Sequence, residues 1–393
     1  MSTQPTRFVQ FVVKISKFCN LRCRYCYEYD ELGDRRAMSR EQLIAMYRNL
    51  RDYYVERDAE DGQRTELRFI WHGGEPLVIP PHMYLETFAD QREVFGDALV
   101  IRNAVQTNLT ILDDARLALL RDGFDFVGVS LDVFGGLRVN SGGKDSQAMV
   151  LANLDKARAA GITLGCITVL TRRNIHLVEK IYRFFVRAQL PFRVLPLFDG
   201  AHAGQHEGFE VGTEALAGAC NELVDLWLSS SERVRVTPIH DYIQRAVRQL
   251  TPGLRPRYFS KRAWNPTVLV NTDGSCFSYG DPYGDPDWCL GNLFESSIAD
   301  IYAGEAFDRS CRAAEARMAA NCTACPYFGA CDGYSIAEEQ TNCREIGESG
   351  VRACVFDRQV LAHVEHRLRT SGVFDGLGDG RGDDPAAQEL TAL

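Results

Sequence analysis

The sequence contains no apolar run approaching the roughly 20 residues that a membrane-spanning helix needs. Its first residues, Met1 to Arg7, are polar and lack the apolar segment of a secretory signal. Basic residues are also in deficit, with Lys+Arg 44 against Asp+Glu 53 and a formal net charge of -9. The missing apolar segments predict a cytoplasmic protein with no membrane contact. Because phosphate binding depends on basic patches, we also expect no nucleic acid partner.

Cysteine, by contrast, is abundant, with 13 in a chain of 393 residues. Thiols stay reduced in the cytoplasm, so this number predicts metal binding rather than disulfides. Three cysteines cluster near the N-terminus, and eight lie between Cys276 and Cys354. Cys166 and Cys220 stand alone and are expected to be buried structural thiols.

Apolar runs of strand type alternate with helical patterns across the first half of the chain. Six such strand–helix pairs predict an α/β fold, a partial (β/α)6 TIM-like barrel with its chemistry at the C-terminal strand ends. The predicted strands are residues 8–15, 67–71, 99–106, 126–131, 164–170 and 192–197. The predicted helices are 40–56, 81–95, 113–121, 146–160, 175–188, 212–228, 239–250 and 355–368. Ser39 and Gln42 are placed as a capping box for the first helix.

Composition divides the chain into four expected parts. These are a barrel at 1–210, bridging helices at 211–265, a cysteine-rich unit at 266–370 and a tail at 371–393. The cysteine-rich unit has many Gly, Pro and Asp residues and few long periodic segments, which is typical of a small unit held together by metal. The tail is rich in Gly and Asp, and we expect it to be disordered.

The first cysteine cluster follows the first strand. Cys19, Cys23 and Cys26 stand in the pattern C-x3-C-x2-C within KFCNLRCRYCY. A structural cluster or zinc site usually has four protein ligands. Three thiolates on one loop would instead bind three corners of a cuboidal iron–sulfur cluster and leave one iron open to a small molecule. A zinc knuckle without its fourth ligand is the alternative interpretation.

This segment resembles the signature of the radical S-adenosylmethionine (SAM) superfamily, with Tyr25 at the aromatic position. The resemblance implies that the open iron of a [4Fe-4S] cluster binds the amino and carboxylate groups of SAM. It also implies that electron transfer then cleaves SAM to methionine and a 5′-deoxyadenosyl radical.

Further motifs at successive strand ends are similar to SAM-binding segments of that superfamily. The second strand is followed by GGEP, the third ends in QTN and the fourth in SLD, and an arginine follows where relatives place one near the SAM carboxylate. Paired glycines permit close backbone approach to a ligand. The loop at 139–143 departs from many relatives, which have a longer basic stretch there. The resemblance assigns SAM binding to Tyr25, Gly73, Gly74, Glu75, Gln106, Asn108, Ser130, Asp132 and Arg138.

The C-terminal cysteines resemble the SPASM domain of radical SAM peptide maturases, through the segments DG…C, CLGNLF and C-x2-CPYFGAC. Eight cysteines suffice for two four-iron clusters. Relatives continue with x3-C, but Ser335 stands at that position, and we propose that Cys343 replaces the missing ligand. Auxiliary cluster I is then assigned Cys276, Cys289, Cys311 and Cys343, and auxiliary cluster II is assigned Cys322, Cys325, Cys331 and Cys354. An open iron or a serine ligand in cluster I, and a zinc ribbon, are the alternatives.

The segments at residues 196–202, 205–208 and 236–242 most resemble those of maturases that form aromatic-to-Cβ cyclophane crosslinks in ribosomal precursor peptides. That resemblance implies three [4Fe-4S] clusters and SAM as cofactors. Its implied partners are a precursor peptide and a low-potential electron donor of the flavodoxin or ferredoxin type. A zinc-binding interaction protein is the alternative from a different functional class.

Anaerobic sulfatase-maturing enzymes share the same two-domain layout and form an alternative within the enzyme class. They oxidise a Cys or Ser to formylglycine and need a general base, often an Asp beside an auxiliary-cluster ligand. Asp281, Asp285 and Asp287 lie near Cys276 and Cys289 and are the candidates for that base.

Overall fold

The computed structural model describes residues 6–197, 204, 207–279, 281–338 and 345–371. The chain forms two units, each densely connected within itself. The first unit combines residues 1–167, 199–206 and 262–311, and the second combines 168–198, 207–261 and 312–393. The N-terminal cysteine motif therefore lies in the first unit and the C-x2-C-x5-C motif in the second.

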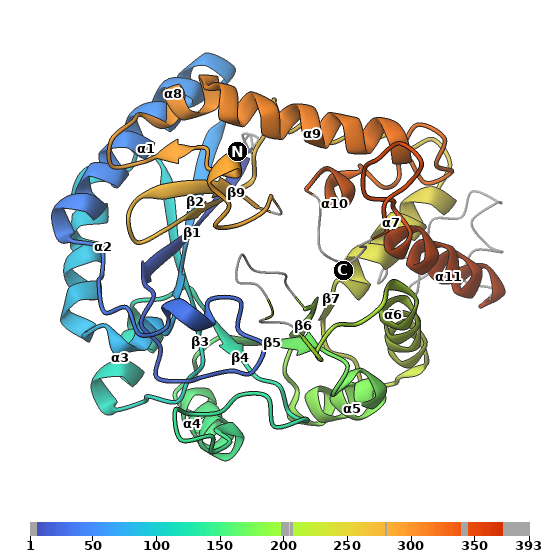
Figure 1. Cartoon of the computed structure of the whole chain (residues 1–393), viewed down its shortest axis with the longest axis horizontal. Coiled ribbons are helices and arrows are strands. Elements are labelled where there is room, and N and C mark those ends of the chain that lie inside the picture. The colour runs from blue at the N-terminus through green and yellow to red at the C-terminus, as the bar shows by residue number, and fades with distance from the viewer. Residues whose placement is uncertain (1–5, 198–203, 205–206, 280, 339–344, 372–393) are drawn as a thin grey trace. The chain divides into compact units, whose positions relative to one another are not determined.

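The first unit is built on a sheet with the strand order β10-β9-β8-β1-β2-β3-β4-β5. The strands from β8 to β5 run parallel, and β9 and β10 extend the sheet in antiparallel fashion (Figure 1). The carboxyl ends of the parallel strands consequently lie at one edge. The bounds are β1 (Thr6–Ser16), β2 (Arg64–Gly73), β3 (Val100–Thr107), β4 (Phe126–Ser130), β5 (Leu164–Leu170), β8 (Thr267–Val270), β9 (Ser275–Ser278) and β10 (Gly291–Asn292).

Strand β1 illustrates how the sequence creates this sheet. Its side chains alternate between two faces, as the pleat requires. Val9, Phe11 and Val13 on one face are at most 1% exposed, and Phe11 stacks on Phe69 of β2. Lys14 lies on the opposite face and is buried as well, although it carries a charge. An apolar strand that contains one buried lysine needs a buried partner for that charge.

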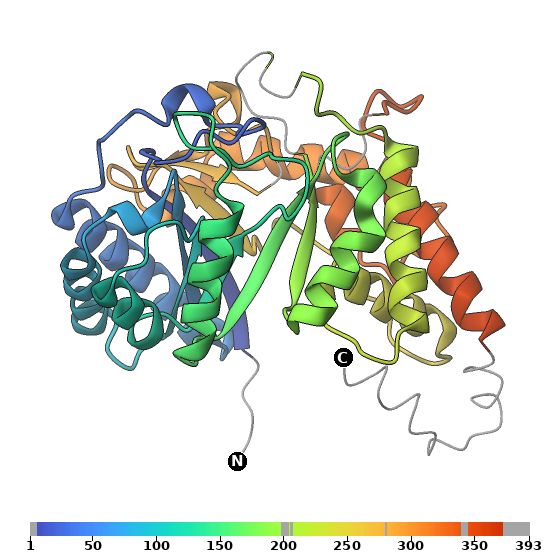
Figure 2. The same cartoon turned by 90° about the horizontal axis from the view of Figure 1, so that it is seen from below.

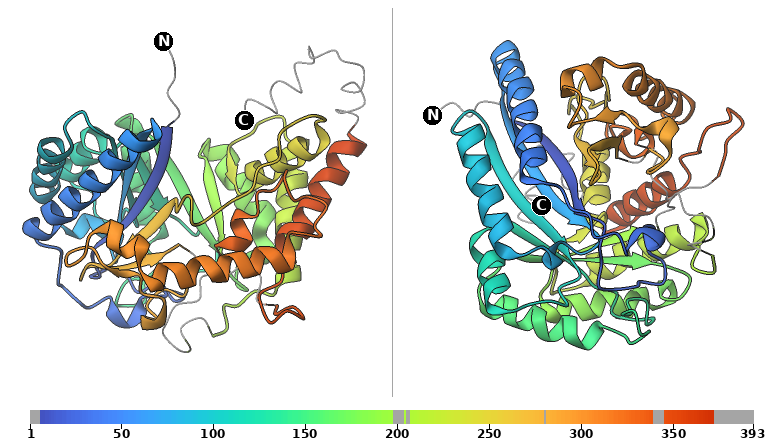
Figure 3. Two further views of the ribbon diagram at one scale, coloured as in Figure 1. Left: turned by 90° about the horizontal axis from the view of Figure 1, so that it is seen from above. Right: turned by 60° about the vertical axis from the view of Figure 1, so that its left-hand side comes forward.

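Helices cover the outer face of this sheet. Figure 3 shows α1 and α2 side by side along the strands. The predicted capping box of α1 is present, because the Ser39 side chain accepts a hydrogen bond from the Gln42 backbone and the Gln42 side chain accepts one from the Ser39 backbone. The helices are α1 (Arg40–Asp61), α2 (Pro81–Phe95), α3 (Asp114–Asp122), α4 (Gln147–Ala159), α8 (Ile298–Ala303) and the start of α9 (Glu305–Asn321). Short 3-10 turns are η1 (Tyr29–Glu31), η2 (Pro76–Val78) and η4 (Pro286–Trp288).

The second unit is mainly helical. Its strands β6 (Phe192–Pro196) and β7 (Val236–Thr237) pair in parallel. Figure 2 shows its long helices packed side by side, with α11 against both α6 and α7. Its helices are η3 (Ile175–Leu177), α5 (Val178–Ala188), α6 (Thr213–Ser229), α7 (Ile239–Leu250), α10 (Tyr334–Ala337) and α11 (Phe356–Thr370).

One long helix was not expected from the sequence. The region 266–370 was predicted to have few long periodic segments, but α9 is a helix of 17 residues. It is rich in alanine, arginine and glutamate, which favour helix strongly. Among the described residues, no helix has the length and apolarity to cross a bilayer.

Candidate active site

The first cysteine motif forms a loop directly after β1. Cys19 is 7% exposed and packs with Leu21 and Leu32, and the Cys23 and Cys26 side chains lie against the same cluster. The Cys19 backbone N–H donates to the Leu32 carbonyl at 3.1 Å, so the loop closes on itself. All three predicted thiols therefore belong to one partly buried cluster of side chains.

Burial makes these thiols poor acids. It raises the pKa of Cys19 and of Cys26 to about 12, and it also raises the pKa of Cys23. Thiolates at this site consequently need a nearby cation, which bound iron supplies. No three His, Cys, Asp or Glu side chains among the described residues converge on a point where they could hold a single ion.

The glycine pair after β2 makes the close backbone approach that its sequence predicts, but the approach is to the cysteine loop. A Cβ on Gly73 would lie 2.1 Å from the Ser16 carbonyl oxygen. On Gly74 it would lie 2.2 Å from the Lys17 oxygen and 2.3 Å from the Phe18 oxygen. The two glycines therefore let β2 end in direct contact with the chain that leads into Cys19.

Glu75 is 2% exposed and holds the end of β3 in place. One carboxylate oxygen accepts hydrogen bonds from Thr107 Oγ1 at 2.6 Å and from the Leu77 backbone at 2.9 Å, and the other accepts from the Asn108 backbone at 2.6 Å. Burial raises the pKa of Glu75, although these donors oppose the shift. The Glu75 carboxylate thus accepts three hydrogen bonds from the protein itself.

Asn108 connects the end of β3 to the cysteine loop. Its side-chain amide donates to Asn20 Oδ1 at 3.0 Å and lies 3.8 Å from Cys19 Sγ. Its carbonyl oxygen accepts from Thr110, which in turn accepts from the Asn20 amide at 2.8 Å. The QTN segment therefore helps to fix the first thiol of the motif.

The two polar residues predicted at the ends of β3 and β4 meet. Gln106 Nε2 donates to Ser130 Oγ at 2.8 Å. Gly128 makes this possible, because a Cβ there would lie 2.1 Å from the Gln106 side-chain oxygen. Gly128 was not singled out in the sequence, and only its position opposite Gln106 in the strand pair could have indicated this role.

Tyr25, Asp132 and Arg138 form a buried triad around Cys23. The Tyr25 hydroxyl donates to Asp132, and Arg138 Nε donates to the same carboxylate at 2.7 Å. Arg138 Nη1 lies 3.8 Å from Cys23 Sγ. Burial lowers the pKa of Arg138, but Asp132, Tyr25 and Cys23 together outweigh burial and raise that pKa. The segment after β4 is thus tied to the second thiol.

The predicted ligands of auxiliary cluster I lie in the first unit, as far as they are described. Cys276 in β9 and Cys289 before β10 belong to one antiparallel pairing, in which the Leu290 backbone donates to the Cys276 carbonyl at 2.8 Å. Cys311 is 0% exposed in α9. Cys343 falls outside the described residues.

The four predicted ligands of auxiliary cluster II come together in the second unit. Cys322, Cys325, Cys331 and Cys354 line one cavity between the loops before α10 and α11. Burial raises the pKa of Cys322 to about 12 and also raises the pKa of Cys331 and Cys354. Ser335 lines the same cavity. The resemblance to relatives had instead assigned the ligand at this position to cluster I. The lone thiols Cys166 and Cys220 are buried, in β5 and α6.

The three candidate bases differ in their surroundings. Asp281 is 1% exposed and accepts a hydrogen bond from Ser310 Oγ, beside Cys311. Asp285 instead caps η4 through the Asp287 backbone N–H, and Asp287 is exposed. Only Asp281 of the three therefore lies buried beside a predicted cluster ligand.

Comparison with known proteins agrees with this geometry. Residues 13–185 match the model of the radical SAM superfamily. The chain is 23% identical over 374 residues to a serine-type anaerobic sulfatase-maturating enzyme of Bacteroides thetaiotaomicron, covering 90% of this chain and 88% of that protein. It is 24% identical over 294 residues to a cysteine-type anaerobic sulfatase-maturating enzyme of Clostridium novyi, covering 73% and 77%.

Solved structures confirm the predicted fold class. "Native anSMEcpe with bound AdoMet and Cp18Cys peptide" superposes with a TM-score of 0.70 at 18% identity, covering 95% of this chain and 100% of that one. Streptococcus suis SuiB bound to precursor peptide SuiA gives 0.52 at 14% identity, covering 76% and 65%. The fold is an α/β partial barrel with a parallel sheet, followed by a cysteine-rich C-terminal region. Neither comparison supports cyclophane formation specifically.

Proposed function

We propose that this radical SAM enzyme oxidises a side chain in a peptide or protein and converts a Cys or Ser to formylglycine, as in sulfatase maturation. One observation carries the proposal: the loop of Cys19, Cys23 and Cys26 is tied to the ends of β2, β3 and β4 by hydrogen bonds and close contacts within the chain. The sulfatase-maturating names of the relatives favour this reaction over the predicted cyclophane crosslink.

The cofactors of the proposal are SAM and [4Fe-4S] clusters. The three thiols of the loop would hold a cluster with one open iron. SAM bound there supplies one-electron chemistry that removes a hydrogen atom from the substrate. The residues proposed to line the SAM site are Tyr25, Gly73, Gly74, Glu75, Gln106, Asn108, Ser130, Asp132 and Arg138.

The contacts of these residues assign them different tasks. Glu75 is held by Thr107 and two backbone N–H groups, so its charge has a fixed position at the edge of the sheet. Such a fixed carboxylate suits an ammonium group without reorganisation. Arg138 is oriented by Asp132, and a planar guanidinium held in this way suits a carboxylate.

Oxidation of Ser to the aldehyde, or of Cys to the thioaldehyde, removes two electrons and two protons in total, and the thioaldehyde then reacts with water to give formylglycine and hydrogen sulfide. Loss of a hydrogen atom accounts for one of each. We propose that Asp281 accepts the remaining proton at its carboxylate, because it is buried beside Ser310 and Cys311. An auxiliary cluster, which would be held by Cys276, Cys289, Cys311 and Cys343 or by Cys322, Cys325, Cys331 and Cys354, would accept the remaining electron.

A peptide substrate is supported by the fold. The solved structures "Native anSMEcpe with bound AdoMet and Cp18Cys peptide" and SuiB bound to precursor peptide SuiA both contain peptides. We propose a cytoplasmic enzyme that also uses a low-potential electron donor of the flavodoxin or ferredoxin type. The cyclophane crosslink in a precursor peptide stays a prediction.

The test is anaerobic reconstitution followed by reaction with SAM, a reductant and candidate peptides that contain a Cys or Ser. Three clusters require about twelve irons per chain. Formylglycine from Ser and a cyclophane crosslink both remove two hydrogens, but only formylglycine carries an aldehyde that a hydrazide probe captures. A product with the mass loss and no aldehyde would overturn the formylglycine proposal.

A further inference from the structure

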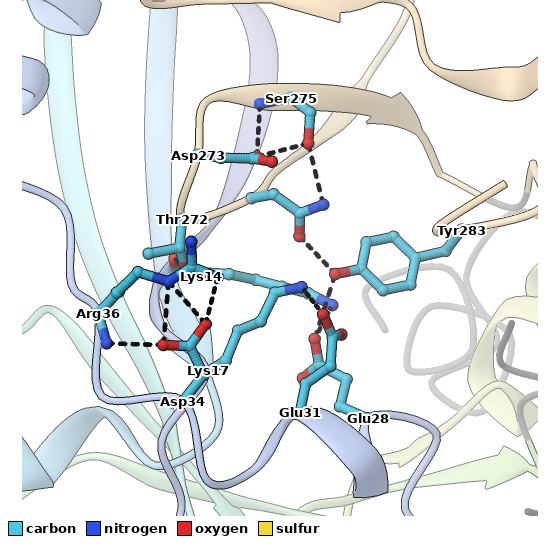
Figure 4. Close-up of polar contacts among 11 residues, drawn as sticks. Lys14, Lys17, Glu28, Glu31, Asp34, Arg36, Thr272, Asp273, Ser275 and Tyr283 are labelled. Atoms are coloured by element: carbon cyan, nitrogen blue, oxygen red, sulfur yellow. Dashed lines mark hydrogen bonds and ion pairs between the residues drawn. The ribbon is translucent and has the colours of Figure 1, made fainter. Parts of the chain in front are cut away.

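A buried ion pair lies beside the first cysteine loop and has no task in the function proposed above. Lys14 Nζ lies 2.7 Å from Glu28 Oε1, with the two side chains 1% and 3% exposed. Lys14 comes from β1 and Glu28 from the turn after Cys26 (Figure 4). Neither residue was singled out in the sequence, although a lysine inside an apolar strand was a visible signal.

Aromatic rings enclose the pair and keep water away from it. Lys14 Nζ lies 3.4 Å from the centre of the Tyr283 ring and 4.7 Å from that of Tyr27. The Tyr283 hydroxyl donates to Glu28 Oε1 at 3.1 Å and also contacts Asn271. Charges in such a dry, ring-lined site act over longer distances than charges in solvent.

The pair is close to a thiol of the first motif. The Glu28 backbone N–H donates a hydrogen bond to the Cys26 thiol, and the charge of Lys14 acts on the same thiol. Local charge and hydrogen bonds to sulfur are two of the main determinants of the reduction potential of an iron–sulfur cluster.

The geometry of the pair is that of an ion pair, with Lys14 Nζ 2.7 Å from Glu28 Oε1. Burial works to raise the pKa of Glu28, but the charge and hydrogen bond of Lys14 outweigh it and hold that pKa below its usual range. Burial lowers the pKa of Lys14, and Glu28 opposes the shift. The site therefore contains two opposite fixed charges that nearly cancel.

A buried ion pair is seldom the most stable way to fill such a space, because desolvation offsets its attraction. Apolar side chains of similar volume would serve stability as well. We infer that Lys14 and Glu28 are positioning residues that set the reduction potential of the cluster held by Cys19, Cys23 and Cys26. This inference rests on the proposed function, because it requires a cluster at that site.

The expected effects have opposite signs. Reduction adds a negative charge to the cluster. Lys14→Met removes the positive charge beside the cluster, so reduction becomes harder and the potential falls. Glu28→Gln leaves the Lys14 ammonium uncompensated, so the potential rises. The double variant K14M/E28Q removes both charges and should return close to the potential of the unaltered enzyme.

The experiment is a redox titration of the full reconstituted chain, followed by electron paramagnetic resonance. The relevant cluster is identified as the one whose signal changes when SAM is added. We expect each single substitution to change the equilibrium constant for reduction by about tenfold, which is about 59 mV for one electron. If Lys14→Met loses the cluster, Glu28→Gln and the double variant still decide the sign.

Lys17 and Glu31 provide a matched control, also drawn in Figure 4. They form the same kind of ion pair in the same loop, but the two side chains are 17% and 37% exposed. Solvent screening should make Lys17→Met and Glu31→Gln shift the potential much less.

Equal-direction shifts in the two single variants, or no shift in either, would overturn the inference while leaving the proposed function intact. Absence of any SAM-responsive cluster in the unaltered enzyme would instead contradict the proposed function itself. The two failures are therefore distinguishable in one series of measurements.

Discussion

At the residue scale, Gly74 is a position where the site has no room for a side chain. A Cβ there would lie 2.2 to 2.4 Å from backbone atoms of Lys17 and Phe18, which cannot move without displacing Cys19. We expect Gly74→Ala to lower the free energy of unfolding by about 1–3 kcal/mol and to reduce iron incorporation at the first motif. Gly33→Ala is the control, because a Cβ there meets nothing within 4 Å. Urea unfolding and iron analysis of both variants check the prediction; equal behaviour would contradict it.

His72 at the end of β2 makes stability depend on pH. Burial, with a smaller contribution from Lys14, lowers the pKa of His72 to about 4. The unfolded chain therefore binds more protons than the folded one between that value and the ordinary pKa near 6.5. The stability that depends on neutral His72 should be fully present above about pH 6.5 and should be lost as the pH falls towards 4. The free energy of unfolding should decrease by about 1–2 kcal/mol between pH 7 and pH 5.

Urea unfolding of the cluster-free protein at those two pH values measures this effect. His72→Gln should remove most of the pH dependence. His82→Gln, at an exposed position of α2, should leave it unchanged. An unaltered pH dependence in His72→Gln would show that other groups cause it.

The sequence predicted which residues lie together where they belong to one short motif or to the ends of adjacent strands. The thiols of C-x3-C-x2-C lie together as expected, and Gln106 meets Ser130. Their proposed contacts with SAM stay predictions. The sequence could not indicate that Gly73 and Gly74 face the chain's own backbone, because that contact joins segments about fifty residues apart. The burial of Asp281 depends on Ser310 in a distant helix and was equally hidden.

At the element scale, the loops before α10 and α11 depend on the cysteines of auxiliary cluster II. Cys354→Ala should lower the iron content by about four atoms per chain, because it removes one of the four thiols that line the cavity. Cys220→Ala is the control, since Cys220 is buried in α6 and has no predicted ligand role. Iron and sulfide analysis after anaerobic reconstitution measures both. Equal iron content in the two variants would speak against cluster II.

Cys343 can be tested in the same way, because its role as the fourth ligand of cluster I is only a prediction. If Cys343 replaces the cysteine that relatives have at the position of Ser335, Cys343→Ala should lower the iron content as much as Cys311→Ala does. If cluster I has an open iron, Cys343→Ala should retain the iron. The variant Ser335→Ala tests the alternative in which Ser335 is a ligand of cluster I. Ser335 itself lines the cavity of cluster II.

The elements of the barrel were predictable because their patterns are strong and regular. The predicted helices 81–95 and 239–250 and the predicted strand 164–170 have the bounds observed for α2, α7 and β5. Helix α1 extends to Asp61, five residues beyond its predicted end, because the left-handed residue that terminates it is Gly62. Helix α9 was not predicted, because its segment was interpreted through its cysteine as part of a metal-binding unit and not through its helix-favouring composition.

At the scale of the whole molecule, the account depends on a cluster with one open iron. The fold and the match to residues 13–185 identify a radical SAM enzyme. The sequence predicted this class correctly, because a cofactor bound by three closely spaced thiols leaves a compact motif. The reaction was predicted less well, since the substrate is recognised by surfaces that no short motif encodes.

The most direct test is to measure 5′-deoxyadenosine formed from SAM by the reduced, reconstituted protein. The account predicts steady formation by the unaltered chain and none above background in the variant with Cys19, Cys23 and Cys26 all replaced by alanine. The Cys220→Ala variant should match the unaltered chain. Equal amounts of 5′-deoxyadenosine from the triple variant and the unaltered chain would contradict the central claim.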